Sequence, residues 1–247
     1  MNLPIGIVSI DGGTAHNAIP RDARAVISLP EDSVESVNAR LKKMFSIFEN
    51  EYKDFEKTIS LSLKPADAED QIITDVLAER ILRLMMVFPN GVEELDPSVY
   101  QGGPLLAETS NNFAMIRTDK EAVRILSSQR SQIMSARDMM SKKIEMLAHL
   151  AGAEYQSGNG YSSWQPDWDS ALLAKAKDIY KKRFGELPKV KVIHGGLECG
   201  VIGAKHKGMD MISLGPTIVN AHSPDESMYI PSIRKVWDLL TELLISL

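Results

Sequence analysis

Strand-like and helix-like stretches alternate along this chain of 247 residues, and that alternation limits it to folds that mix sheet with helix. Residues 5–10 (IGIVSI) and 25–29 (AVISL) are short and rich in β-branched side chains, which is typical of strands. Over residues 34–55, apolar side chains recur every three or four positions, which predicts an amphipathic helix. Asp32 and Glu35 have the spacing of a capping box at its start. We therefore predict an α/β fold class.

The same two patterns predict the remaining strands and helices, and a change in composition marks a boundary between domains. Further strands are predicted at residues 58–63, 108–116, 121–131, 189–194 and 209–215, and further helices at residues 68–88, 135–150, up to 184, and from 232. Residues 156–170 (QSGNGYSSWQPDWDS) are rich in glycine, serine and aromatic side chains, which is typical of a linker between domains. We expect one domain over residues 1–157 and another over residues 158–247. In the second, the loops HGGLECG and NAHSPDE follow predicted strands, where open α/β sheets bind their ligands.

Charge and composition exclude several classes of function. The formal net charge is −5 and 44% of the residues are hydrophobic, which is ordinary for a globular protein and gives no electrostatic attraction to nucleic acid. No apolar run is long enough to cross a bilayer, and the first residues lack the pattern of a secretory leader. The single cysteine, Cys199, cannot form an internal disulfide. We therefore expect a cytoplasmic protein that binds neither nucleic acid nor membrane.

The loop NAHSPDE, after the apolar run MDMISLGPTIV, holds the best candidate for a metal ligand, His222. An imidazole on a loop can offer one nitrogen to a metal while a neighbour orients the other. A metal site needs several ligands, however, and none of the five histidines lies in an HxH or HExxH pair. His149 and His206 fit a helix and a solvated turn, and His194 fits either a core or a pocket position. The residues alone therefore assemble no metal site.

Four other positions have a structural and a functional interpretation, and the residues alone leave the choice open. Glu198, after two flexible glycines, is either a pocket carboxylate or part of a tight turn. Arg130 can clamp a substrate carboxylate with its two-pronged guanidinium, or it can be a surface charge. Asn17 can present its amide to a ligand or cap its own turn. Cys199 lies in no nucleophile motif and fits a buried small residue.

A set of motifs, taken in order along the chain, carries a family resemblance. They are GGTAHNAIPRDA, PNGV, ETSNN, SSQRS, GYSSWQPD, VIHGGLECGVI, MDMISLGPTI and NAHSPDE. Together they resemble the bacterial Xaa-His (aminoacyl-histidine) dipeptidases, in the metallopeptidase family that includes carnosinase, peptidase T and acetylornithine deacetylase. The resemblance spans nearly the whole chain, and its most specific part is HGGLECG followed at this distance by GPTIVNAHSPDE.

In that family, two zinc ions activate a water molecule that attacks the peptide carbonyl. The resemblance implies that His222 is the last ligand of the two-zinc site. It also implies that Asn17 and Arg130 hold the C-terminal carboxylate of a dipeptide substrate. Asn17 is expected to act across a homodimer, because the lid domains of this family commonly dimerise. The loop that lines the family's substrate pocket corresponds to Gly196, Leu197 and Glu198.

The family's other motifs are missing from this chain. It has no H-x-D motif, no Glu-Glu pair in a matching context and no GGHSGG stretch. The resemblance therefore implies the C-terminal half of a dipeptidase. Residues 1–157 would be an α+β lid used for dimerisation, and residues 158–247 would be the last part of an α/β catalytic domain. No catalytic residue is assigned in this chain, and we expect it to be inactive alone, because one imidazole cannot hold two zinc ions. The alternative hypothesis is a non-catalytic lid module that self-associates or binds peptides without metal.

Overall fold

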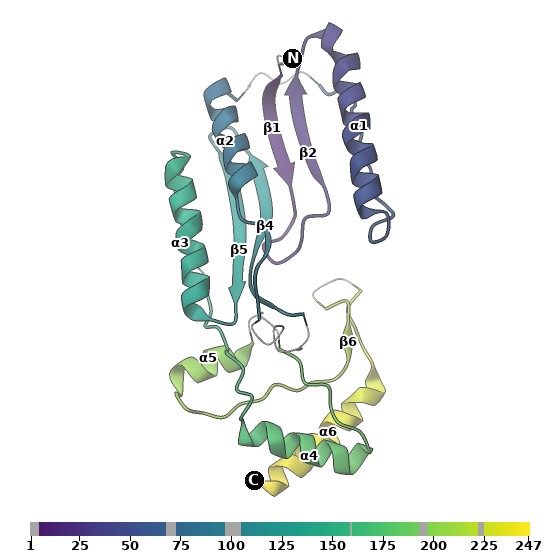
Figure 1. Ribbon diagram of the computed structural model, residues 1–247, viewed down its shortest axis with the longest axis vertical. Coiled ribbons are helices and arrows are strands. Elements are labelled where there is room, and N and C mark those ends of the chain that lie inside the picture. The colour runs from purple at the N-terminus through teal and green to yellow at the C-terminus, as the bar shows by residue number, and fades with distance from the viewer. Residues whose placement is uncertain (1–4, 68–72, 97–104, 159, 193–196, 222–224) are drawn as a thin grey trace. The chain divides into compact units, whose positions relative to one another are not determined.

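The computed structural model of the protein describes residues 5–67, 73–96, 105–158, 160–192, 197–221 and 225–247 (Figure 1). The chain divides into two compact units. Unit 1 consists of Met1–Asn90, Asn111–Ser128 and Lys143–Tyr155, and unit 2 consists of Gly91–Ser110, Gln129–Lys142 and Gln156–Leu247. The chain therefore passes between the units several times. The division near residue 157 into a lid and a catalytic portion stays a prediction, whereas the predicted mixture of helix and sheet is confirmed.

Antiparallel strands from the start of the chain open the sheet. β1 (Gly6–Gly12) pairs with β2 (Ala23–Ser28), and a bulge interrupts the pairing between Ile7 and Ser9. β2 is an edge strand, because β1 is its neighbour in the strand order β2-β1-β4-β3. The strands predicted at residues 5–10 and 25–29 are therefore confirmed.

Three later strands complete the sheet. β4 (Ala107–Thr118) pairs with β1 through Gly12 and Ile116, while β3 (Gly91–Leu95) and β5 (Val123–Ser131) both pair with β4. The strands predicted at residues 108–116 and 121–131 are confirmed. β3 was not predicted, because its sequence GVEEL carries two adjacent acids and shows no apolar alternation.

Helix α2 (Asp75–Val87) packs against β1 and closes the core of unit 1. This core consists of apolar side chains from β1, α2 and β4: Ile7, Ile10, Ala78, Ile81 and Ile116. The side chain of Thr74 caps α2 by accepting a hydrogen bond from the Leu77 N–H at 3.4 Å. Residues 73 and 74 are not helical, so α2 is shorter than the predicted range 68–88.

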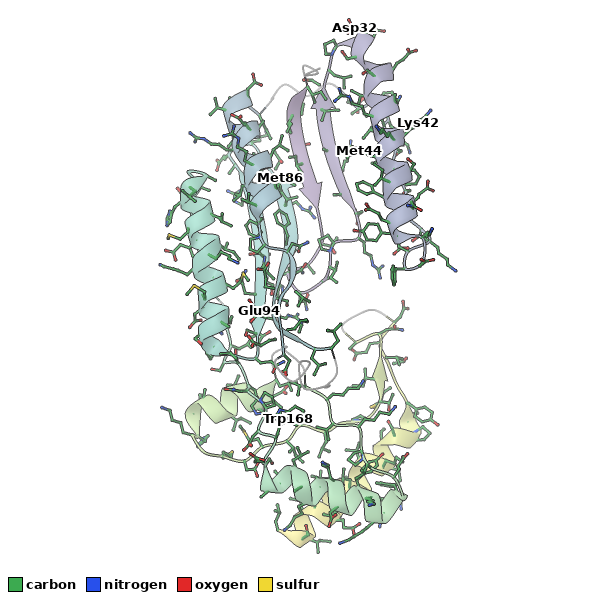
Figure 2. The ribbon with its side chains drawn as sticks, viewed as in Figure 1. Asp32, Lys42, Met44, Met86, Glu94 and Trp168 are labelled. Atoms are coloured by element: carbon green, nitrogen blue, oxygen red, sulfur yellow. The ribbon has the colours of Figure 1, made fainter. Side chains whose placement is uncertain are left out.

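Helix α1 (Val34–Tyr52) confirms the first predicted helix, but the predicted capping box is wrong. A 3₁₀ turn, η1 (Glu31–Ser33), precedes α1, and no side chain caps either element. Because Asp32 lies inside this turn, its carboxylate is not at the boundary of α1 and accepts a hydrogen bond from the Ser33 hydroxyl at 3.2 Å. Within α1 only Val37 is buried, so most of the predicted apolar face is exposed, including Met44 (Figure 2).

The strand predicted at residues 58–63 is wrong, because this segment has no regular secondary structure. Its first residue is held locally: the Thr58 N–H and hydroxyl both donate to the Glu56 carboxylate, at 3.0 Å and 2.7 Å. These two bonds make the Glu56 pKa lower than usual. An alternating pattern forms a strand only where a neighbour supplies the ladder, and none of the described strands pairs with this segment.

Helices α4 (Ala171–Phe184) and α6 (Ile230–Ser246) form the core of unit 2. Four buried apolar side chains join them: Ala176, Ile179, Leu239 and Leu243. α4 ends as predicted at Gly185, which adopts φ +76°. α6 begins two residues before its predicted start, with Pro231 in its first turn, where a missing N–H costs no helical bond.

Helix α3 (Met134–Leu150) confirms the prediction at residues 135–150, and Gly152 with φ +70° follows its end.

The predicted strands at 189–194 and 209–215 are wrong over their described residues, which form no strand. The predicted loop HGGLECG is wrong from Glu198 onward, because helix α5 (Glu198–Lys205) begins there. In this region the described strands are β6 (Ile218–Val219) and β7 (Ser227–Met228), which pair with each other.

Candidate functional site

Asn17 lies in the loop between β1 and β2, and two side chains of β4 hold this loop in unit 1. Arg117 donates a hydrogen bond to the Gly12 carbonyl at 2.9 Å, where the loop begins. Asn112 donates to the Ala18 carbonyl at 2.8 Å, next to Asn17. The Asn17 side chain itself is exposed. The loop therefore presents this amide to solvent from a well-anchored base.

Arg130 lies near the end of β5, in unit 2, and its side chain is half-buried. The next two residues are buried and bonded. Ser131 shares a hydrogen bond of 2.9 Å with the Thr109 hydroxyl, and the Gln132 amide donates to the Ala107 carbonyl at 3.1 Å. Among the residues that the structure describes, no carboxylate forms an ion pair with Arg130. The backbone next to Arg130 is therefore anchored at the end of β5.

The glycine-rich loop region of unit 2 is organised around α5. Leu197, the residue before α5, is half-buried, and Glu198 in its first turn is exposed. α5 approaches the motif segment GYSSWQPD closely, since a Cβ on Gly200 would lie 2.3 Å from the Ser162 carbonyl oxygen. The same segment is tied to the start of α3, where Ser163 donates its N–H to the Met134 sulfur at 3.1 Å.

Cys199 and Asp210 have structural roles in this region. Burial raises the pKa of the Cys199 thiol, which keeps it protonated and unlike a catalytic thiolate. Asp210 accepts a hydrogen bond of 2.6 Å from the Ser170 hydroxyl and another of 2.9 Å from the Leu172 N–H. These bonds, the one from Ser170 first, hold the Asp210 pKa below its usual range. Asp210 and Ser170 together anchor the start of α4.

The β6–β7 pair carries the loop that contains the candidate ligand. Asn220, at the start of this loop, adopts φ +53°, a left-handed conformation that asparagine tolerates better than most residues. The predicted ligand His222 lies outside the described residues, as do Gly196 and His194. Within the described ranges, no group of three or more histidine, cysteine, aspartate or glutamate side chains could hold a metal ion.

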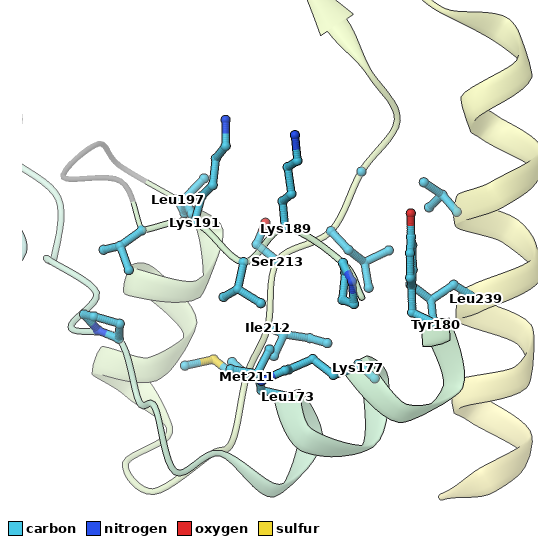
Figure 3. A pocket seen from close by; sticks show the side chains of 18 of the residues that line it. Leu173, Lys177, Tyr180, Lys189, Lys191, Leu197, Met211, Ile212, Ser213 and Leu239 are labelled. Carbon is cyan, nitrogen blue, oxygen red and sulfur yellow. The ribbon is translucent and has the colours of Figure 1, made fainter. Parts of the chain in front are cut away.

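Unit 2 contains a pocket of about 550 Å³ (Figure 3). It is lined by α4, α6 and two extended segments that include residues 188–192 and 211–215. Leu197 also lines it, whereas Arg130 and Glu198 do not. The structure therefore brings one of the predicted site residues into this pocket.

Four lysines line the pocket against a single acidic residue, Asp167; they are Lys177, Lys189, Lys191 and Lys235. Lys189 and Lys191 point the same way from one extended segment (Figure 3). Lys235 is engaged already: its Nζ lies 3.3 Å from the Glu186 carboxylate and 5.0 Å from the centre of the Phe184 ring. This basic lining was not predicted from the sequence, although the alternation in KVKV was a signal for it.

Comparisons with known proteins cover nearly all of this chain. It is 34% identical over 242 residues to the cytosol non-specific dipeptidase of Escherichia coli (strain K12), which covers 98% of this chain and 49% of that protein. Its fold matches the crystal structure of aminoacylhistidine dipeptidase from Vibrio alginolyticus with a TM-score of 0.87. That match has 31% sequence identity and covers 99% of this chain and 49% of the other.

The chain resembles one half of a dipeptidase. The resemblance stated from the sequence motifs is thereby confirmed, and the chain spans about half the length of the dipeptidases it matches. Residues 3–56 also match the M20 peptidase dimerisation domain, a range that includes β1, β2 and α1. No helix in the described part of the chain is long and apolar enough to span a membrane.

Proposed function

We propose that this chain supplies the lid and part of the catalytic domain of a zinc-dependent dipeptidase that hydrolyses Xaa-His and related dipeptides in the cytoplasm. The similarity to two dipeptidases over 98% and 99% of this chain is the observation that carries the proposal. The remaining zinc ligands and the catalytic groups would come from sequence equivalent to the other half of those proteins.

The described residues do not fit a two-zinc site by themselves, since they contain no cluster of three possible ligands. In the proposal, His222 supplies one imidazole nitrogen, and zinc, when bound, makes a water molecule nucleophilic. The purified 247-residue chain is therefore expected to show no zinc-dependent hydrolysis of alanyl-histidine. The measurement is release of free histidine with and without added zinc. Sustained hydrolysis that a chelator abolishes would contradict the proposal that the remaining zinc ligands come from sequence equivalent to the other half of the relatives.

Binding of the substrate carboxylate is assigned to Arg130, with Asn17 contributing from the loop between β1 and β2. The half-buried Arg130 guanidinium has no ion-pair partner among the described residues, and its two parallel N–H groups match a carboxylate. Asn17 is exposed on an anchored loop, as an amide that reaches a second subunit would need to be. Leu197 and Glu198 stay proposed pocket residues on the strength of the resemblance.

Replacing Arg130 with alanine is expected to weaken alanyl-histidine binding by roughly 10- to 100-fold, because charge-assisted hydrogen bonds contribute about 1.5–3 kcal/mol. Isothermal titration measures the affinity. Arg124→Ala is the matched control: Arg124 lies on the same strand but is exposed and paired with Asp119. Alanyl-histidinamide, which lacks the carboxylate, is a second control and should bind weakly to every variant. Equal affinity for the acid and the amide would overturn the role of Arg130.

The alternative, a lid module that dimerises without catalysis, is favoured by two observations of unit 1. Residues 3–56 match a peptidase dimerisation domain, and this range contains an edge strand, β2, and a helix whose apolar face is exposed. Met44 and Ile47 on α1 are 48% and 46% exposed, although both are apolar. Dimerisation through β2 and α1 is compatible with both functions, but the module hypothesis predicts a dimer and peptide binding that a chelator does not affect.

The double substitution Met44→Asp and Ile47→Asp is expected to weaken the homodimer at least about 100-fold, because each buried apolar side chain contributes about 1.5–3 kcal/mol. Light scattering after size exclusion distinguishes a dimer from a monomer of 27.3 kDa. Met86→Asp on α2, where Met86 is 86% exposed, makes the same chemical change away from β2 and α1. A monomeric unmodified chain, or a dimer insensitive to the double substitution, would contradict the proposed interface.

A further inference from the structure

The loop between β1 and β2 is held against β4 at two points in unit 1. At its start, a Cβ on Gly13 would overlap the carbonyl oxygen of Ala114, so the backbones of loop and strand are in close contact. The Gly13 N–H closes the base of the loop by donating to the Asp22 carbonyl at 3.2 Å. Further along, the side-chain amide of Asn112 donates to the Ala18 carbonyl at 2.8 Å. The part of the loop between these two points carries Asn17.

Asn17 lies in a turn at the tip of this loop. The Ala18 N–H donates to the Ala15 carbonyl, which places His16 and Asn17 at the two central positions of the turn. This bond is 3.3 Å long, whereas such bonds usually measure about 2.9–3.0 Å. Among the residues that the structure describes, the side chain that bonds to this turn is Asn112. Asn112 therefore restrains the residue that directly follows Asn17.

Asn112 is itself fixed, because both of its neighbours in β4 are bonded to the residues that follow α2. The Asn111 amide donates to the Pro89 carbonyl at 2.5 Å, and the Phe113 N–H donates to the side-chain oxygen of Asn90 at 2.9 Å. Asn111 is also buried, with 2% of its surface exposed. The bond from Asn112 therefore ties the tip of the loop to a firmly anchored part of β4.

Arg117 fixes a different part of the loop. Its guanidinium donates to the carbonyls of Gly12 and Gly13, where β1 ends and the loop begins. Gly12 is also the residue through which β1 pairs with β4. A change at Arg117 would therefore disturb the sheet as well as the loop, whereas Asn112 bonds to the loop beside Asn17 and away from that pairing.

We propose that Asn112 is a positioning residue for substrate binding, which holds the turn in the conformation in which the Asn17 amide meets the substrate carboxylate. The inference rests on the proposed function, which assigns that contact to Asn17. A turn that samples several conformations binds its ligand with an affinity reduced by the fraction of molecules in the competent conformation. One hydrogen bond between neutral groups changes such an equilibrium by roughly 2- to 10-fold. Asn112 has this effect without touching the substrate.

Asn112→Ala is expected to weaken alanyl-histidine binding by the full chain by roughly 2- to 10-fold. The double variant with Asn17→Ala should bind no more weakly than Asn17→Ala alone, because Asn112 acts through Asn17. Isothermal titration of the unmodified chain, the two single variants and the double variant measures this coupling. Light scattering and circular dichroism check that each variant keeps the oligomeric state and the fold of the unmodified chain.

Two controls accompany this titration. Asn50→Ala makes the same change at another hydrogen-bonded asparagine of unit 1, whose side-chain oxygen accepts from the Lys53 ammonium at 3.3 Å on the surface of the protein. This variant should bind alanyl-histidine as the unmodified chain does. Alanyl-histidinamide lacks the carboxylate, so its weaker binding should not change in Asn112→Ala.

Nitrogen-15 relaxation of the chain without ligand measures the restraint on the turn directly. In Asn112→Ala, the order parameters of residues 15–18 are expected to fall from about 0.85, typical of rigid backbone, toward about 0.6. In Asn17→Ala they should stay unchanged, because the bond from Asn112 to Ala18 is kept. Gly13, whose N–H is bonded at the base of the loop, should stay ordered in both variants.

Three results would overturn the proposal: a turn that stays equally ordered in Asn112→Ala, a loosened turn with unchanged affinity, or losses of affinity that add in the double variant. Failure of the proposed function looks different. A chain that prefers alanyl-histidine to its amide but is unaffected by Asn112→Ala contradicts the positioning role alone. A chain that binds the two ligands equally contradicts the carboxylate site and, with it, the positioning role.

Discussion

Replacing Gly13 with alanine is expected to unfold unit 1 or to lower its free energy of unfolding by at least about 3 kcal/mol. A Cβ on Gly13 would lie 1.9 Å from the carbonyl oxygen of Ala114 and 3.0 Å from its carbonyl carbon. Both atoms belong to the backbone of β4, so neither can rotate away without breaking the sheet. Gly13 also adopts φ +70°, which side chains rarely tolerate. The clash and the conformational strain act together at this position.

Gly152→Ala is the matched control for this prediction. Gly152 lies in unit 1 and has the same φ of +70°, but a Cβ there would meet only the guanidinium end of Arg80, at 3.2 Å. That flexible side chain can move, so the expected loss is about 1–2 kcal/mol from backbone strain alone. Urea unfolding followed by circular dichroism compares the two variants. Equal losses would show that Gly13 makes no close approach to β4.

Gly200→Ala is expected to lower the free energy of unfolding of unit 2 by roughly 2–3 kcal/mol. Alanine in a helix normally stabilises it by about 1 kcal/mol relative to glycine, so helix propensity alone predicts the opposite sign. The packing of α5 against residues 162 and 163 decides the sign of the change in the free energy of unfolding. A Cβ on Gly200 would lie 2.3 Å from the Ser162 carbonyl oxygen and 3.4 Å from the Ser163 carbonyl carbon, and both are backbone atoms.

Gly203→Ala in the same helix separates packing from propensity. Its Cβ would meet the terminal methyl of Met211 at 2.6 Å, and that side chain can rotate away. We expect this variant to be neutral or stabilised by up to about 1 kcal/mol. All three tryptophans, Trp164, Trp168 and Trp237, lie in unit 2, so their fluorescence reports the unfolding of this unit. A loss in Gly203→Ala as large as that in Gly200→Ala would contradict the close contact with residues 162 and 163.

Four of the five strands of the sheet, all except β3, could be predicted because their sequences are apolar or alternating and their pairing partners lie in this chain. Residues 25–29 meet β1 across a short connection, and residues 108–116 and 121–131 are neighbours in the sheet. The helices could be predicted because a helix satisfies its backbone hydrogen bonds within itself. The boundary signals were less dependable: Asp32 and Glu35 have the spacing of a capping box, but the 3₁₀ turn before α1 moves Asp32 off the boundary.

The candidate site could be predicted only in part. The motifs led to a dipeptidase resemblance that the comparisons confirm, and to Arg130 and Asn17, which the structure finds on a strand end and an anchored loop. Their binding roles and the ligand role of His222 stay predictions. The lysines around the pocket were missed, because a residue pattern does not reveal which side chains of α4, α6 and the extended segments converge.

The sequence by itself determined helices α1, α2, α3, α4 and α6, strands β1, β2, β4 and β5 of the sheet, and the resemblance to a dipeptidase, since each depends on local patterns or on motifs within the chain. It did not reveal β3 or α5. The tertiary structure alone decided whether strand-like runs become strands. Residues 58–63, 189–192 and 209–215 have strand-like patterns but form no ladder, because a strand exists only where a neighbouring backbone accepts and donates its hydrogen bonds. It also decided that the apolar face of α1 and one face of α6 stay exposed, because periodicity shows which face is apolar and only packing shows what covers it.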